Sequence, residues 1–159
     1  MIIKKSKYLF TGVFSFLTIL LIFFFLKFVF VSEEEKIERM ILTAKNAFER
    51  EDPELLIGFI SRGYQDEMGF DYSGVREGLY EIFSQFEGIK VSLSELEVEV
   101  VGEEAKVQLD VWILAKYEDQ PVFLIGSLNN PVPSKVFLQR EDGEWKVVKF
   151  LLSSSNFNK

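Results

Sequence analysis

The uncharged stretch Tyr8–Leu26 constrains the fold of this chain more than any other feature. It holds 19 residues rich in Phe, Leu and Ile, and beyond Lys27 the apolar run continues to Val31. About 20 helical residues, each rising 1.5 Å, match a bilayer core of roughly 30 Å. The Lys27 ammonium lies one turn from the end of the run and can reach the headgroups. We therefore predict a transmembrane helix, so that the chain contacts the membrane through Tyr8–Val31.

The alternative is a cleaved signal peptide, whose hydrophobic region typically spans about 7–15 residues and ends in small residues. The run in this chain is longer. Its end, Phe28-Val29-Phe30-Val31-Ser32, has no pair of small residues spaced for cleavage. The sequence favours an uncleaved anchor.

The charges that flank the apolar run predict its orientation. Three lysines precede it and three glutamates follow it: Lys4, Lys5 and Lys7, then Glu33, Glu34 and Glu35. Because positive flanks stay in the cytoplasm, we predict a single-pass protein of the cytoplasmic membrane with its N-terminus inside. The expected parts are a cytoplasmic tip and anchor at 1–32, an extracytoplasmic domain at 33–155 and a frayed tail at 156–159.

Composition excludes several classes of function for the part after Ser32. It carries 14 basic and 25 acidic residues, a formal charge of −11, which repels phosphate and argues against nucleic acid as a partner. The chain has no cysteine and no histidine. Disulfides, thiolate metal sites, cysteine nucleophiles and histidine bases are therefore absent, and we expect no cofactor and no metal.

Three helices are predicted from apolar stripes with a period of 3.6 residues. The first spans 33–51, the second runs from Asp52-Pro53 to Gly63, and the third is capped by Asp71 or Ser73 and stops at Gly88. The stripe of the first helix is Ile37, Met40, Ile41, Ala44, Ala47 and Phe48; that of the second is Leu55, Leu56, Phe59 and Ile60; that of the third is Val75, Leu79, Ile82, Phe83 and Phe86.

After Gly88 the apolar period becomes two, which indicates strands. Apolar residues alternate over 89–93 and again over 96–100 in the opposite parity, so a bulge is expected near Ser94-Glu95. The clearest strand has one apolar face over 105–115. The segment 119–133 is expected to be a long connection with a short strand at 122–125. Strands 134–141 and 144–152 form a hairpin around Asp142-Gly143. Helices followed by a curved antiparallel sheet indicate the α+β class.

One run of residues carries a family resemblance. Ile60-Ser61-Arg62-Gly63-Tyr64-Gln65-Asp66-Glu67-Met68-Gly69 resembles the Leu-Ser-x-x-Tyr-x-Asp-x-x-Gly run of bacterial members of the nuclear transport factor 2-like superfamily. The third helix ending in Phe86, the Leu96–Glu99 strand and the Asp142–Val147 hairpin also resemble this superfamily, which includes ketosteroid isomerases and polyketide cyclases. The resemblance covers about 33–155. It implies a cone of three helices on a curved sheet of about four strands, often paired through the sheet.

The candidate pocket residues lie where such a cone is expected to be hollow. They are Phe83, Val107, Leu109 and Val111, with Tyr64 and Asp66 at the mouth. The strand at 105–115 turns no ionisable residue inward, and Asp110 has the opposite parity. Of the polar residues, only Tyr64, Asp66 and Asp71 are placed to act on a substrate. The competing interpretation gives them turn and packing roles.

The candidate interface is the outer face of the sheet. Trp112 and Leu114 share their parity with Asp110 and Lys116, which places a tryptophan and a leucine among polar neighbours. Exposed apolar residues on a sheet mark docking surfaces, and tryptophan is common in binding hot spots. The alternative is that the 119–133 connection or the C-terminal tail covers them.

From these observations the sequence favours a non-enzymatic, membrane-tethered domain that binds a protein partner, including a second copy of itself, through Trp112, Leu114 and Asp110. The first alternative is a binder of a small apolar ligand in the cone. The second alternative is an isomerase-type or cyclase-type enzyme that uses Tyr64 and Asp66.

Overall fold

The computed structural model describes residues 16–22 and 32–153. The chain divides after Ser32 into two units, which are considered separately. In the first unit, residues 16–22 are helical. Among the described residues, no helix has the length and apolar character needed to cross a bilayer. Most of the predicted anchor Tyr8–Val31 lies outside those residues, as does the predicted tail at 156–159.

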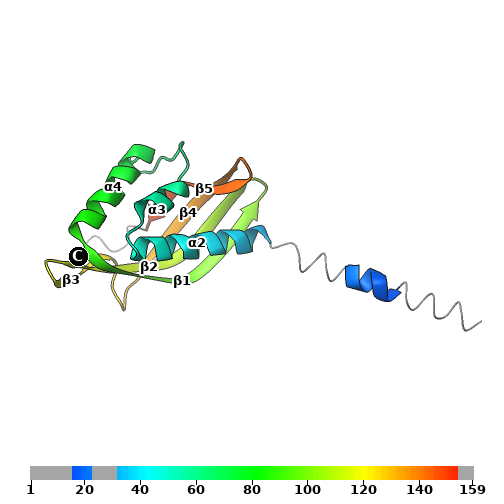
Figure 1. The fold of residues 1–159 in the computed structure, drawn as a ribbon, viewed down its shortest axis with the longest axis horizontal. Coiled ribbons are helices and arrows are strands. Elements are labelled where there is room, and N and C mark those ends of the chain that lie inside the picture. The colour runs from blue at the N-terminus through cyan, green and yellow to red at the C-terminus, as the bar shows by residue number, and fades with distance from the viewer. Residues whose placement is uncertain (1–15, 23–31, 154–159) are drawn as a thin grey trace, which may run out of the picture. The chain divides into compact units, whose positions relative to one another are not determined.

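The second unit has three helices followed by five strands (Figure 1). The helices are α2 (Glu33–Glu49), α3 (Pro53–Gly58) and α4 (Tyr72–Gln85). The strands are β1 (Glu87–Val101), β2 (Glu104–Tyr117), β3 (Gln120–Ile125), β4 (Val132–Glu141) and β5 (Glu144–Leu152). All pairings are antiparallel, in the order β1-β2-β4-β5, with β3 added beside β2. The α+β prediction is therefore confirmed.

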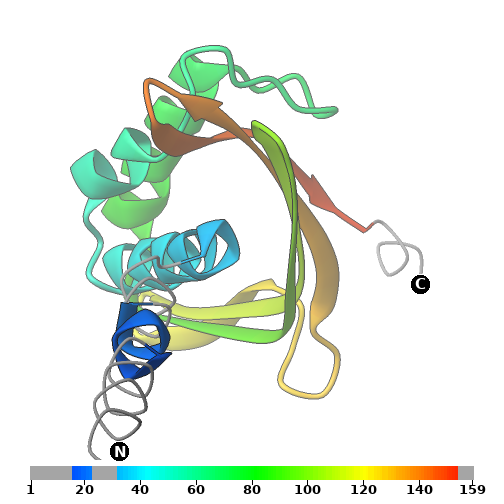
Figure 2. The same ribbon diagram turned by 90° about the vertical axis from the view of Figure 1, so that its right-hand side faces the viewer.

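The sheet is strongly curved, and α2 lies in its concave side (Figure 2). A bulge in β1 lies where the parity change predicted it: the pairing with β2 shifts between Ser94 and Glu97. Glu95 adopts a left-handed backbone with φ of 51°. Such an extra residue bends a strand and increases its twist.

The core lies between α2 and the concave face. The inward residues of β2 alternate with outward ones, and all six are buried: Ala105, Val107, Leu109, Val111, Ile113 and Ala115. Ile37 of α2 and Val107 of β2 are both fully excluded from solvent. Every buried member of this core lies between Ile37 and Val147, so the domain has a core of its own.

Two of the predicted elements are wrong in extent. The second helix ends at Gly58 and not at Gly63, because the chain then joins the sheet: Ser61 N–H donates to the Val147 carbonyl at 2.9 Å. The sheet has five strands where the resemblance implied about four, and the short strand predicted at 122–125 is confirmed as β3. The turn Glu118-Asp119, with φ of 48° and 61°, sends β3 straight back along β2, which shortens the expected connection.

Two strands pair in succession with the same edge of β2. Its first part, up to Val111, pairs with β4. From Ile113 onward it pairs with β3. Gly126 lies at this change, with φ of 60°, and an added Cβ would approach Asn130 O at 3.0 Å and Val111 O at 3.1 Å.

Gly126→Ala is therefore expected to lower the free energy of unfolding by more than the ~1–2 kcal/mol of a left-handed alanine alone, because backbone atoms also crowd its Cβ. Gly102→Ala is the matched control, since Gly102 has φ of 62° and open space around its Cβ. Urea unfolding of the two variants compares them. An equal loss of stability would show that the crowding at Gly126 has no effect.

Candidate functional site

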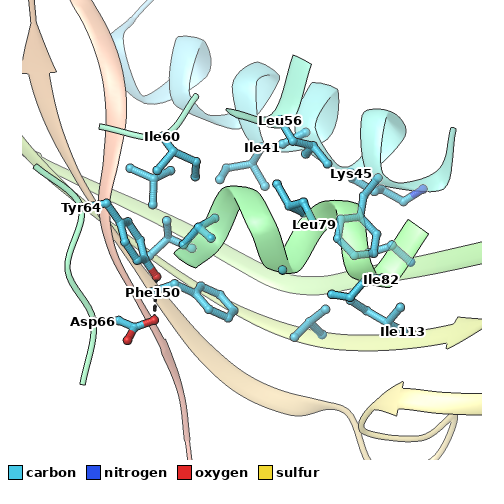
Figure 3. Close-up of a pocket in the computed structure, with 18 of the residues that line it drawn as sticks. Ile41, Lys45, Leu56, Ile60, Tyr64, Asp66, Leu79, Ile82, Ile113 and Phe150 are labelled. Carbon is cyan, nitrogen blue, oxygen red and sulfur yellow. Dashed lines mark hydrogen bonds between the residues drawn. The ribbon is translucent and has the colours of Figure 1, made fainter. Parts of the chain in front are cut away.

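A cavity of about 400 Å³ lies between α2, α4 and the concave face of the sheet. This volume lies within the range of small-molecule sites. Its wall is mainly apolar (Figure 3). The lining residues are Ile41, Ala44, Lys45, Phe48, Leu56, Ile60, Tyr64, Asp66, Phe70, Gly74, Val75, Gly78, Leu79, Ile82, Val91, Leu93, Leu109, Val111, Ile113, Val136, Val147 and Phe150.

Helix α4 forms one wall of the cavity. Asp71 caps it by accepting a hydrogen bond from Gly74 N–H at 2.8 Å, and of the two caps offered by the sequence the structure shows Asp71. Val75, Leu79 and Ile82, which belong to the predicted apolar stripe of α4, line the cavity. No residue of α4 is fully buried. Part of the stripe thus faces the cavity, while Phe83 packs against Phe48 of α2.

Tyr64 and Asp66 form a closed polar pair at one end of the cavity (Figure 3). The buried Tyr64 hydroxyl donates to Asp66 Oδ2 at 3.0 Å. The other carboxylate oxygen, Oδ1, accepts from the backbone N–H groups of Met68 at 2.9 Å and Phe70 at 3.0 Å. Burial raises the pKa of Tyr64, and the hydrogen bond and charge of Asp66 raise it further. The tyrosine therefore stays protonated, with its proton engaged.

A second closed pair lies at the opposite end. Lys45 Nζ contacts Glu49 Oε2 at 2.8 Å, and Glu49 Oε1 accepts from Val91 N–H at 2.9 Å. Figure 3 shows Lys45 at the far end from Tyr64. Both pairs satisfy their own polar atoms, so the cavity presents hydrocarbon to any occupant.

The Glu49 interactions predict a loss of stability in acid. Burial raises the pKa of Glu49, but hydrogen bonds from Lys45 and Val91 bring it below its ordinary value of 4.5. A carboxyl whose pKa is lower in the folded state stabilises the fold above its unfolded pKa, and this is lost as the pH falls through the folded value. The free energy of unfolding is expected to fall below pH 4.5, and less steeply in Glu49→Gln. Urea titrations from pH 7 to 3 measure both slopes, and parallel slopes would contradict the assignment.

Four of the six predicted pocket residues line the cavity: Leu109, Val111, Tyr64 and Asp66. Phe83 does not line it, because its ring packs edge-on against Phe48 with centroids 5.1 Å apart. Val107 does not line it either, since it is fully buried in the core. Sequence reasoning missed Gly74, Gly78 and Phe150. The two glycines lie beside the apolar stripe of α4, and their lack of a side chain was the available signal.

The outer face of the sheet carries the predicted interface residues. Trp112, Leu114 and Asp110 are all half-buried. The Trp112 ring meets the Phe123 ring of β3 edge-on, with centroids 6.2 Å apart, and Phe123 remains 42% exposed. The segment 119–133 thus contributes an aromatic side chain to this face and leaves part of it exposed to solvent.

Within residues 16–22 and 32–153, no group of three acidic side chains is arranged to hold a metal ion. No known family model matches this sequence, and neither does any curated protein.

Several solved structures are similar to this chain. A provisionally assigned aromatic ring hydroxylase from Novosphingobium aromaticivorans is 14% identical, with a TM-score of 0.63 over 74% of this chain and 85% of its own. A cystatin-like protein of unknown function from Nostoc punctiforme is 15% identical, with a TM-score of 0.58 over 79% and 96% of the two chains. A provisionally assigned dehydratase of the NTF2-like family from Streptomyces avermitilis is 18% identical, with a TM-score of 0.60 over 74% and 92%.

These similarities define the fold of the domain. It is an NTF2-like fold, also called cystatin-like, as the sequence resemblance implied. At such identities the similarity shows the fold alone and assigns no activity.

Proposed function

We propose that this protein is a membrane-tethered, non-enzymatic binder of a small apolar ligand. The supporting observation is the apolar cavity of about 400 Å³, with its polar groups paired among themselves. Apolar burial supplies about 25 cal/mol per Å², and an uncharged hydrocarbon guest would leave no polar group of the wall unpaired. In this proposal Tyr8–Val31 anchors the chain in the cytoplasmic membrane and the domain lies outside the cytoplasm.

The test uses the fragment 33–159, whose core is self-contained, in detergent-free buffer. Titration with N-phenyl-1-naphthylamine, an uncharged apolar fluorophore, is expected to give saturable binding with one site per domain. Native mass spectrometry of the same preparation then shows whether a ligand is retained from the cell. The absence of both saturable binding and a retained ligand would contradict the proposal.

Catalysis by Tyr64 and Asp66 has less support. Acid–base chemistry needs a group that can exchange a proton with the substrate. The Tyr64 proton is bonded to Asp66, and three hydrogen bonds occupy the Asp66 carboxylate. Tyr64→Phe is therefore expected to leave probe binding intact. A tenfold or larger change in affinity would instead indicate that the hydroxyl contacts the occupant.

Assembly through the outer sheet face is a second candidate function. It is favoured by the partly exposed aromatic and aliphatic side chains Trp112, Leu114 and Phe123, since exposed apolar patches mark interaction sites. Trp112→Asp is expected to lower the mass of the fragment in light scattering without unfolding it. Leu128→Asp, at a position 65% exposed, is the control. A monomeric parent fragment at high concentration would exclude self-association.

A further inference from the structure

Phe70 lies between the cavity and the solvent. Within residues 32–153 it is the one cavity-lining residue that is exposed, since all the others are buried or half-buried. It is 44% exposed, and yet it contributes to the apolar wall. A residue that both lines a cavity and meets bulk water stands at an opening of that cavity. The loop between α3 and α4 therefore places an aromatic side chain at a mouth.

The backbone of Phe70 is held at both of its polar atoms. Its N–H donates to Asp66 Oδ1 at 3.0 Å, and its carbonyl accepts from Asp66 N–H at 3.1 Å. The preceding Gly69 has φ of 88°, a left-handed conformation that glycine adopts without strain. With the main chain fixed in this way, rotation about the side-chain bonds is the movement that remains to the phenyl ring.

The ring lies against the first turn of α4. A Cβ added at Gly74 would lie 3.0 Å from Phe70 Cδ1, so the glycine leaves the room in which the ring rests on the helix. Gly74 also lines the cavity. The Phe70 ring therefore bridges the loop 66–71 and α4 beside the cavity, and it does so through van der Waals contacts alone.

The opposite end of the cavity is closed by stronger interactions. Figure 3 shows Lys45 there, at the far end from Asp66. Glu49 of α2 pairs with Lys45 at 2.8 Å and accepts from Val91 N–H of β1 at 2.9 Å. A ligand that passed between α2 and β1 would break these charge-assisted hydrogen bonds, whereas rotation of the phenyl ring breaks no hydrogen bond. The mouth at Phe70 is thus the easier route.

We propose that Phe70 is the gate of the cavity, and that its ring rotates away from Gly74 to admit the ligand. This inference rests on the proposed ligand binding and adds the route by which the ligand enters. A gate that is closed for most of the time lowers the association rate constant in proportion to the fraction of molecules that are open. The same ring must move for release, so the gate also lowers the dissociation rate constant.

Stopped-flow fluorescence of fragment 33–159 with N-phenyl-1-naphthylamine measures both rate constants. Phe70→Ala is expected to raise the association rate constant about tenfold or more, as an opened gate requires. A residue that acts only as part of the wall would change the dissociation rate constant and leave association unchanged, because lost contacts shorten the residence time. Phe70→Trp keeps an aromatic ring and makes it larger, and is expected to slow association.

Met68→Ala is the matched control. Met68 belongs to the same loop and is 66% exposed, but it does not line the cavity, so both rate constants should stay unchanged. Urea unfolding of each variant checks the fold. Association rate constants that are equal in the unchanged fragment, Phe70→Ala and Phe70→Trp would overturn the gate and leave the proposed function standing. Absence of saturable binding in every variant would overturn both.

Discussion

Replacing Gly78 with leucine is expected to weaken ligand binding and, at the same time, to stabilise the domain. Gly78 lines the cavity from α4, and a Cβ added there meets no atom within 4 Å. The leucine side chain would therefore extend into the space that the ligand occupies. Replacing a glycine inside a helix also raises helix propensity, worth about 1 kcal/mol. Affinity for the naphthylamine probe should fall about tenfold or more.

Gly78→Ala is the control for this experiment. It gives the same gain in helix propensity but adds one carbon atom, so it should retain most of the probe binding. Fluorescence titration and urea unfolding are run on both variants. Reduced binding together with raised stability cannot come from damage to the fold. Unchanged affinity in Gly78→Leu would show that the probe binds outside this cavity.

Ile37→Ala is expected to cause the largest loss of stability. Ile37 is fully buried and holds α2 against the sheet, and truncating such a side chain typically costs about 2–5 kcal/mol. A domain of this size has roughly 5–15 kcal/mol in total, so the fraction of folded protein should fall measurably. Because α2 forms one wall of the cavity, probe binding should weaken with it.

The control is Leu42→Ala in the same helix. Leu42 is 50% exposed, and surface substitutions usually change stability by about 0.5 kcal/mol or less. The midpoints of chemical unfolding compare the two variants. A loss of the same size at both positions would contradict the assignment, because alanine raises helix propensity at both and only Ile37 is packed against the sheet.

The sequence predicted the parts of the fold that local chemistry determines. Asp142-Gly143 adopts two left-handed residues, with φ of 50° and 85°, and joins β4 to β5 as expected. The parity change in β1 located its bulge. The turn Glu118-Asp119 has the same left-handed geometry but no glycine, so no sequence signal marked this turn. The sequence predicted only a short strand at 122–125 within a long connection, and β3 begins two residues earlier, at Gln120.

The cavity was only partly predictable. Alternation along β2 identified Leu109 and Val111 correctly, because a strand has only two faces. A helical stripe gives the side of the helix that avoids water, without showing whether a partner or a hollow lies there. Phe83 and Val75 share the stripe of α4, yet one packs on Phe48 and the other faces the cavity. That difference depends on the distance between helix and sheet, which no local pattern encodes.

The extra residue at Glu95 has a consequence for how this domain tolerates changes in length. The apolar residues of β1 change parity at the bulge, so deleting one residue there would turn either Val91 and Leu93 or Leu96, Val98 and Val100 to the opposite face of the sheet. Val91 and Leu93 line the cavity. Insertions and deletions in this strand would therefore alter the curvature and the lining of the wall together, whereas substitutions would alter the lining alone.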